Sequence, residues 1–457
     1  MKNLILLFAI LISFNATALS QSWVQTGAIP DGAGVTELIV TSQGTLLVAT
    51  ASWSSISGTL GGVRRSTDEG NTWDNVLEGF NGRTLYLGDN GVVFASFWPH
   101  PLEEGLYRST NDGANWTRLH FVNNGDNIFS ITSKDNNNTI FIGTRNGVQR
   151  STNAGINWSY VNNGIPPDSW VRDIATDTSS GIVLAATTNG VFSTTNNGNT
   201  WDMATGINPQ DTIVKIKFDY SQEGDAKDEP IVFIGSDDAS VYLASKDVRY
   251  LFYTLLTIFK EEDEITGIDI YYLQQENAKW YGVTQFPETG NLNQNGGFHL
   301  SRDGQIFETN NSGLPQETRP SALAVNGSTM RGGTTEVNFY MGSFENAIDG
   351  AKVYKLTYIV GVEQISSEVP SGYSLSQNYP NPFNPSTKIK FDILESCIVK
   401  LTVFNTLGQE VALLLNENLT YGSYEYEFDA QGLTSGVYFY KLQTENFSET
   451  KKMLLVK

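Results

Sequence analysis

The sequence RRSTDEGNTW at residues 64–73 recurs three times, and this repeated stretch decides the fold. The further copies are YRSTNDGANW at 107–116, QRSTNAGINW at 149–158 and FSTTNNGNTW at 192–201. Successive copies open 43, 42 and 43 positions apart, and two alternating apolar runs precede each of them. A period of this length is typical of the four-stranded blades of a β-propeller.

Each copy is predicted to form a tight turn between the third and fourth strands of a blade. An Asp or Asn side chain can accept hydrogen bonds from turn amides, and glycine readily adopts a positive φ. The tryptophan that ends each copy should begin the outer strand and pack between neighbouring blades. These structural positions are Ser66, Asp68, Gly70, Trp73, Ser109, Gly113, Trp116, Ser151, Gly155, Trp158, Thr194, Gly198 and Trp201.

The pattern S/T-x-D/N-x-G-x-x-W resembles the Asp-box of the BNR repeat family. That family of propellers includes sialidases, sortilin-type receptors, xyloglucanases and photosystem II assembly factors. The resemblance implies a propeller whose boxes lie at the outer rim and have a structural role. Function in such propellers lies at the mouth of the central channel, where loops of successive blades meet.

Alternating, strand-like runs continue beyond residue 205 without further good copies of the repeat. They predict two more blades and then a unit of only three strands, SALAVN, VNFYMGSF and AKVYKLTY. The stretch SWVQTG at residues 22–27 matches the Trp-led strands after each repeat and can supply the missing fourth strand. We therefore expect an all-β chain with a seven-bladed β-propeller over residues 21–359. Six and eight blades stay open, because the last three are inferred from strand rhythm alone.

The C-terminal part of the chain predicts a second domain. Residues 360–372 are polar and proline-bearing, which indicates a linker, and residues 373–457 contain six or seven alternating runs typical of a small Ig-like β-sandwich. NYPNPFNPST at 378–387, TLGQEV, GLTSGVYFYKL and the terminal KKMLLVK resemble the sorting domain of the type IX secretion system. The resemblance implies that residues 373–457 engage that machinery and that the chain crosses the outer membrane.

Residues 1–20 are predicted to be a secretory signal peptide, with Lys2, a short apolar core and an A-x-A site. No later segment is apolar for long enough to span a bilayer. The net charge of −20 makes nucleic acid an unlikely partner. The single cysteine, Cys397, excludes an intrachain disulfide and is expected to be a small buried residue. We expect a monomer that is extracellular or on the outer cell surface.

Long loops between the second and third strands of blades one, two and six indicate a ligand-binding mouth. Trp53, Trp98 and His100 lie in the first two of these loops, and Trp170 with Arg172 enters blade four from the same face. Exposed aromatic rings stack on sugar rings, and nearby Arg or Asn side chains bind hydroxyl groups. The alternative is that these side chains pack the loops against one another.

No catalytic set, cofactor or metal site is predicted. Arg83, Arg172 and Arg319 lie near the starts of inner strands, but the arginine motif that precedes the first blade in sialidases is absent. The histidines are scattered, which argues against a metal site. The leading hypothesis is a secreted or surface-displayed, non-catalytic propeller that binds a glycan or an envelope protein. Two alternatives stay open: a polysaccharide hydrolase using acids such as Glu264 or Asp269, and an envelope assembly or stability factor.

Overall fold

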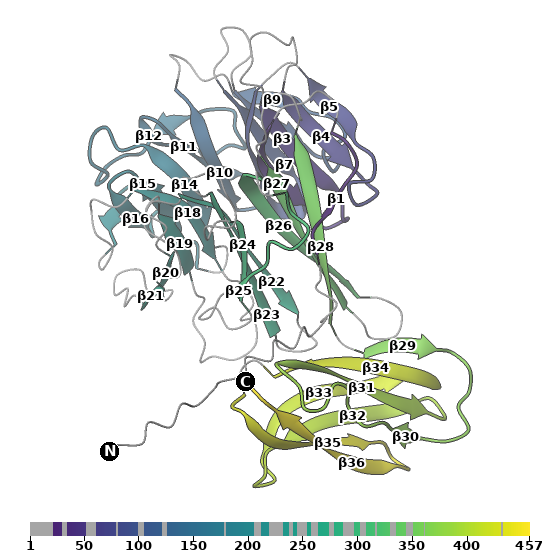
Figure 1. Cartoon of the computed structure of the whole chain (residues 1–457). Coiled ribbons are helices and arrows are strands. Elements are labelled where there is room, and N and C mark those ends of the chain that lie inside the picture. Colours follow the sequence, from purple (N-terminus) through teal and green to yellow (C-terminus); the bar gives the residue numbers. More distant parts are fainter. Residues whose placement is uncertain are drawn as a thin grey trace, which may run out of the picture. The chain divides into compact units, whose positions relative to one another are not determined.

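In the part of the chain that it describes, the computed structural model consists of β-strands with one short 3-10 turn, η1 (Asp89–Gly91), and confirms the all-β class (Figure 1). It describes residues 22–29, 34–51, 61–78, 81–98, 105–120, 126–177, 180–204, 212–218, 232–236, 241–244, 254–256, 264–273, 278–286, 297–301, 308–315, 318–329, 335–343, 351–360, 362–430 and 433–457. Within these residues no helix is long and apolar enough to cross a membrane. The chain divides into two compact units at Val362.

The described strands of the first unit form seven antiparallel sheets of four strands each. Sheet 1 contains β2 (Gly34–Val40), β3 (Leu46–Ala51), β4 (Gly62–Ser66) and β5 (Asp74–Glu78), and sheet 2 contains β6 (Gly82–Leu87), β7 (Val93–Phe97), β8 (Leu106–Ser109) and β9 (Thr117–His120). Sheet 3 contains β10 (Ile128–Lys134), β11 (Thr139–Thr144), β12 (Gly147–Ser151) and β13 (Ser159–Tyr160), and sheet 4 contains β14 (Val171–Thr176), β15 (Val183–Thr187), β16 (Gly190–Thr194) and β17 (Asp202–Met203).

The remaining three sheets follow the same strand order. Sheet 5 contains β18 (Ile213–Phe218), β19 (Val232–Ser236), β20 (Val241–Ala244) and β21 (Thr254–Leu256), and sheet 6 contains β22 (Glu264–Leu273), β23 (Ala278–Phe286), β24 (Gly297–Ser301) and β25 (Glu308–Thr309). Sheet 7 contains β26 (Pro320–Thr329), β27 (Thr335–Ser343), β28 (Lys352–Val360) and β1 (Val24–Gln25).

The sheets close into a ring. The first strand of each sheet contacts the first strand of the next in chain order, and β26 contacts β2, so these strands are innermost. The fourth strand of sheet 7 comes from the start of the described chain, since Val24 pairs with Lys355 of β28 (Figure 1). The sequence predicted this exchange. It makes the two ends of the first unit part of one sheet, in the arrangement of a β-propeller.

The four repeated turns share one hydrogen-bond pattern. In the first, the Ser66 hydroxyl donates to Asp68 Oδ1 and accepts from the Gly70 amide, each at 2.8 Å, and the Thr72 amide donates to Asp68 Oδ1 at 2.9 Å. Gly70 has φ of 86°, in the region that glycine occupies without strain. Equivalent bonds form in the other three turns, centred on Asn111, Asn153 and Asn196.

The tryptophans after these turns pack between neighbouring sheets. Trp73 lies in an apolar layer that joins sheets 1 and 7, and Trp201 in one that joins sheets 3 and 4. Trp116 and Trp158 cover the edges of the layers between sheets 1 and 2 and between sheets 2 and 3. Large aromatic side chains fill the space that opens where the sheets diverge toward the rim.

The second unit consists of two further four-stranded antiparallel sheets. One contains, in spatial order, β29 (Val362–Ser366), β34 (Gly422–Asp429), β31 (Ser386–Ile393) and β30 (Ser374–Leu375). The other contains β33 (Glu410–Leu419), β32 (Cys397–Phe404), β35 (Gly436–Gln443) and β36 (Ser448–Leu455). The fully buried Tyr440 hydroxyl of β35 donates to the carbonyl of Ser376 at 2.8 Å and accepts from the amide of Asn378 at 2.7 Å.

Two expectations for this part of the chain need correction. The predicted linker 360–372 contains β29, an edge strand of five residues, which is too short for its alternation to stand out in the sequence. Cys397 is half-buried rather than buried, because it begins β32, and its Sγ lies 4.0 Å from the Tyr373 hydroxyl.

Candidate functional site

The innermost strands share an irregularity that sets up the site. In every sheet the pairing of the first strand with the second skips one residue of the first strand, which is a β-bulge. The skipped residues are Thr36, Arg83, Phe129, Arg172, Val214, Thr266 and Ser321. We call the end of the ring where these strands begin the mouth face. Bulges bend a strand and redirect the side chains beside them.

Five side chains from three consecutive sheets contact one another on the mouth face, and we call them the aromatic row. The Arg83 guanidinium carbon lies 4.3 Å from the ring centroid of Trp98 and 4.9 Å from that of Phe129. Phe129 stacks on Trp170 with centroids 6.0 Å apart and ring planes 13° apart. Arg145 stacks on Trp170 at 4.7 Å. The row therefore runs Trp98, Arg83, Phe129, Trp170, Arg145.

The local structure explains why these residues meet. Arg83 and Phe129 occupy the bulges of β6 and β10, and Arg145 lies in the turn between β11 and β12. The Trp98 amide donates to the carbonyl of Asn81 at 2.8 Å, which holds the end of β7 against the start of β6. The Trp170 amide donates to Thr188 Oγ1 at 3.2 Å, beside the turn between β15 and β16. All five backbones are thus fixed at the same end of their sheets.

Two of the predicted mouth residues, Trp98 and Trp170, are brought together by this row. Both are half-buried, as is Arg172, which occupies the bulge of β14 two residues beyond Trp170. Trp53 and His100 lie outside the described residues. Glu264 and Asp269 lie on β22, but their side chains are outside the description.

His299 lies apart from the row, on sheet 6, and the side chain of His120 is outside the description. His120 ends β9, and the buried His299 of β24 has Nδ1 3.0 Å from Thr309 Oγ1. Burial lowers the pKa of His299 to about 4. A side chain held neutral in this way has a structural role in sheet 6.

Sequence reasoning missed Phe129 and Arg145. Phe129 occupies the same position of its repeat unit as Arg83 and Arg172, so alignment of the repeats on their first strands carries the signal. Arg145 lies in a turn, TRNG, that reads as an ordinary hydrophilic connection. Only the stacking on Trp170 distinguishes it from other surface arginines.

An ion pair crosses the central channel at the level of the bulges. Lys215 Nζ of sheet 5 lies 3.3 Å from Glu37 Oε2 of sheet 1, and these two sheets are not neighbours in the ring. Burial alone would lower the pKa of Lys215, but the carboxylates of Glu37 and Asp173 outweigh it and raise that pKa. Lys215 is therefore a cation held inside the channel. We call the Glu37–Lys215 pair the channel bridge.

Asp173 has a structural role beside the channel bridge. Its Oδ1 accepts from the Ser130 hydroxyl at 2.6 Å and from the Ile174 amide at 2.9 Å, and its Oδ2 accepts from the Ile216 amide at 2.8 Å. These partners belong to sheets 3, 4 and 5. One carboxylate thus satisfies backbone amides that the bulges expose and ties three sheets together.

A cavity of about 450 Å³ occupies the channel. Its lining begins at Glu37, Asp173 and Lys215 and continues along the innermost strands to residues such as Val40 and Phe218, away from the mouth face. The channel bridge therefore lies at the mouth-face end of the cavity. A molecule bound at the aromatic row lies outside this bridge.

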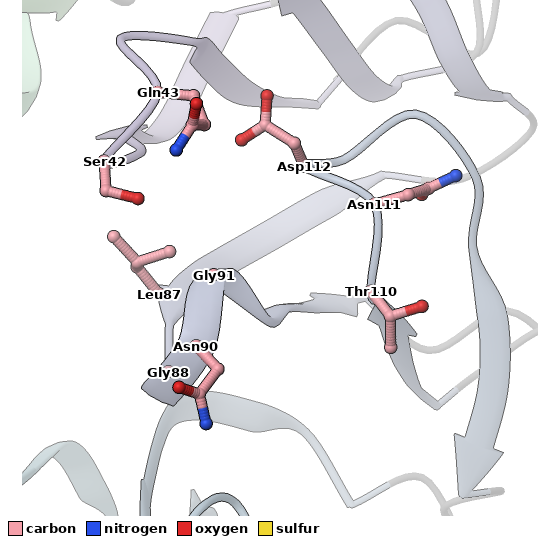
Figure 2. A pocket seen from close by; sticks show the side chains of 9 residues that line it. All are labelled: Ser42, Gln43, Leu87, Gly88, Asn90, Gly91, Thr110, Asn111 and Asp112. Atoms are coloured by element: carbon pink, nitrogen blue, oxygen red, sulfur yellow. The ribbon is translucent and has the colours of Figure 1, made fainter.

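A second hollow lies at the opposite end of sheets 1 and 2 (Figure 2). It is formed by turns and lined by Ser42, Gln43, Leu87, Gly88, Asn90, Gly91, Thr110, Asn111 and Asp112. Figure 2 shows Thr110 and Asn111 with side chains directed away from Ser42 and Leu87. The Asp112 carboxylate already accepts from Arg65 Nη2 at 3.0 Å and from the Thr45 hydroxyl. The polar groups here serve the contact between two sheets, so the aromatic row is the better candidate site.

Comparison with known proteins identifies the second unit. The secretion system C-terminal sorting domain family matches residues 377–457. No curated protein matches the chain. The sorting domain shows that the protein is exported by type IX secretion to the cell surface or the extracellular space.

Solved structures resemble the fold at low identity. The β-propeller domain of Cps50 (Swd1) from Myceliophteria thermophila is 9% identical with a TM-score of 0.50, over 73% of this chain and 99% of that one. The extracellular domain of a one component system from B. thetaiotaomicron is 12% identical with a TM-score of 0.49, over 96% of this chain and 59% of that one. An ancestral GH74 enzyme is 14% identical with a TM-score of 0.43, over 94% and 63%. The chain thus spans 59% of the length of the B. thetaiotaomicron protein, and the first of these similarities supports a propeller-like fold.

Proposed function

We propose that this exported propeller is a non-catalytic binding module whose ligand, a glycan or a protein, contacts the aromatic row on the mouth face. The observation that supports the proposal is the continuous contact of Trp98, Arg83, Phe129, Trp170 and Arg145 across three sheets. Aromatic and arginine side chains held in fixed orientations are the groups that contribute most to binding, because little conformational freedom is lost when a ligand arrives.

Binding is a better interpretation than hydrolysis for Glu37 and Asp173, two of the carboxylates described near the mouth. Glycoside hydrolysis requires two carboxyl groups of which at least one is available for proton transfer to the substrate. Glu37 is paired with Lys215, and Asp173 accepts three hydrogen bonds from the protein itself. Both carboxylates are engaged in holding the ring together.

We also propose that the four repeated turns are Asp-boxes of the BNR type. Their shared pattern of hydroxyl, carboxylate or amide, and glycine supports this, as does the packing of the following tryptophans between sheets. In this interpretation the turns stabilise the rim and take no part in ligand binding.

A glycan array together with a pull-down from the native cell envelope tests the binding proposal. We expect the purified full chain to retain a ligand, and Trp98→Ala and Trp170→Ala to weaken retention at least tenfold, since each truncation removes a large contact worth about 2 kcal/mol or more. Tyr421→Ala, at an exposed aromatic residue of the second unit, is the control and should bind normally. Ligand retention that is indifferent to both tryptophans contradicts the proposal.

A further inference from the structure

The end of the aromatic row presents a cation. Arg145 is exposed, and its guanidinium carbon lies over the Trp170 ring, 4.7 Å from the ring centroid. Within the described part of the chain no carboxylate forms an ion pair with Arg145. Because the ring contacts a face of the guanidinium, the N–H groups at its edge can still donate to a ligand as a planar fork. This fork matches the two oxygens of a carboxylate.

The row is cationic although the chain as a whole carries a formal charge of −20. Arg83 and Arg145 are two of its five members, and Arg172 lies two residues from a third. The row itself therefore contributes two positive charges to the mouth face. An anionic ligand would be attracted locally while the rest of the surface repels it.

The extent of the row bears on the shape of ligand that it can accept. The channel bridge spans the channel at the end of the cavity nearest the mouth face. The contacts of the row run from Trp98 to Arg145 over sheets 2, 3 and 4. A site that extends over three sheets suits an extended chain better than a compact small molecule.

From these observations we infer that the ligand is a polysaccharide bearing carboxylate groups, such as a polyuronate; this inference rests on the proposed function. The ends of the row combine a half-buried indole, Trp98, with an exposed guanidinium, Arg145. A uronate residue offers a matching group to each of these side chains: an apolar ring face that can stack on the indole and a planar carboxylate that can pair with the guanidinium. An acidic peptide has the carboxylates but no flat ring at each unit.

Biolayer interferometry on the immobilised full chain tests the inference. The probes are oligogalacturonate, oligomannuronate and a glucuronate-containing oligosaccharide, each beside its carboxyl-reduced neutral form, and poly-L-glutamate. We expect at least one acidic oligosaccharide to bind at least tenfold more tightly than its neutral form. Binding should weaken as salt rises, since the contact is a partly exposed ion pair.

Variants at Arg145 separate charge from geometry. Arg145→Gln should weaken binding of the acidic oligosaccharide about tenfold, the order expected for a charge-assisted hydrogen bond. The affinity of Arg145→Lys for the acidic oligosaccharide should lie between those of the natural protein and Arg145→Gln, because lysine keeps the charge and loses the planar fork. Arg118→Gln, at an exposed arginine of β9, is the matched control and should bind like the natural protein.

The outcomes distinguish this inference from the proposed function. Equal binding of acidic and neutral oligosaccharides, still dependent on Trp98, overturns the carboxylate inference and leaves the binding proposal intact. Preference for poly-L-glutamate, lost in Arg145→Gln, shows that an acidic protein is the ligand and overturns the polysaccharide. Failure of all three acidic oligosaccharides to bind overturns the inference outright, and ligands that bind independently of every row residue overturn both.

Discussion

At the level of single residues, the four repeated turns show that a charged or a neutral hydrogen-bond acceptor can stabilise the same turn. One turn uses the carboxylate of Asp68, and the other three use the amides of Asn111, Asn153 and Asn196 in the same hydrogen bonds. Each needs an acceptor for backbone N–H groups, and the negative charge is not required.

A pH-dependence experiment at Asp68 checks this equivalence. Hydrogen bonds from Thr72, and then from Ser66, hold the pKa of the Asp68 carboxyl below its ordinary value of 3.8. The unfolded chain therefore binds this proton first as the pH falls, so the stabilisation is present at neutral pH and is lost below about pH 4. We expect Asp68→Asn to match the natural protein in Tm at pH 7 and to lose less Tm between pH 7 and pH 3.

Asp68→Ala is the control for the hydrogen bonds themselves. It removes the acceptor that Ser66 and Thr72 use, so its Tm should lie below that of Asp68→Asn throughout the pH range. If both variants have the same melting profile, the side chain at residue 68 does not act as an acceptor in the turn.

At the scale of strands and turns, neighbouring sheets are joined by contacts that repeat around the ring. In three of the four repeated turns, the residue just before the turn glycine contacts a basic side chain of the preceding sheet. Lys355 pairs with Glu69 at 2.7 Å, Arg65 pairs with Asp112 at 3.0 Å, and Arg150 donates to the carbonyl of Asn197. The first of these contacts joins sheet 7 to sheet 1, beside the point where β1 completes the ring.

Closure of the ring depends on the strand β1 and on the residue before it. Trp23 is 2% exposed, donates from Nε1 to the Asn310 carbonyl at 2.9 Å and meets the edge of Phe298 with centroids 5.0 Å apart. We expect Trp23→Ala to lower the free energy of unfolding by about 3–5 kcal/mol, the usual cost of truncating a buried aromatic side chain. Urea denaturation of the full chain measures this change.

The next residue supplies a matched control. Val24 belongs to β1 but is 64% exposed, so Val24→Ala should change the free energy of unfolding by no more than about 0.5 kcal/mol. Similar losses in the two variants would contradict the role of the Trp23 side chain in closing the ring and would leave the backbone pairing of β1 as its contribution.

At the scale of the whole molecule, the ring is held from inside as well as at its rim. The channel bridge joins sheets 1 and 5 across the centre, and Asp173 joins sheets 3, 4 and 5. Their charges lie where solvent is restricted, so each partner depends on the other for neutralisation. These charged groups thus connect sheets across the channel, in addition to the strand pairing that closes the ring.

A double-mutant cycle on Glu37 and Lys215 measures the coupling free energy of the channel bridge. Glu37→Gln removes the partner of a cation inside the channel, and we expect it to cost about 1–3 kcal/mol of folding free energy. Lys215→Gln should cost a similar amount, and the double variant less than the sum, with a coupling of about 0.5–3 kcal/mol. Additive losses in urea denaturation would show that the two groups do not interact in solution.

Export is a property of the second unit and can be tested separately from binding. Deleting residues 373–457 removes the sorting domain while leaving every strand of the seven-sheet ring in place. We expect the truncated chain to accumulate in the periplasm, in contrast to the full chain, when cell fractions are probed with an antibody. Normal appearance of the truncated chain outside the cell contradicts the role assigned to this domain.

The fold was largely predictable because it rests on local and repeated signals. The period of about 43 residues, the turn chemistry and the alternation of apolar residues each act over short stretches of chain, and Trp23 revealed the exchanged strand by matching the other Trp-led strands. The candidate site was only half predictable. Trp98 and Trp170 stood out as large aromatic residues near loops, whereas Phe129 and Arg145 look ordinary until sheets 2, 3 and 4 are placed side by side.

The repeated four-stranded unit, the turns, the order of the two units and the export signal of residues 377–457 could be predicted from the sequence alone. Those features depend on backbone preferences and periodicity, which act over short stretches of chain. The contact of Arg83 with Trp98, and that of Lys215 with Glu37, 178 positions apart along the chain, became visible in the folded ring. Such contacts form because the closed ring brings residues that are distant in the sequence to the same face. No short-range sequence pattern predicts which of these residues will touch.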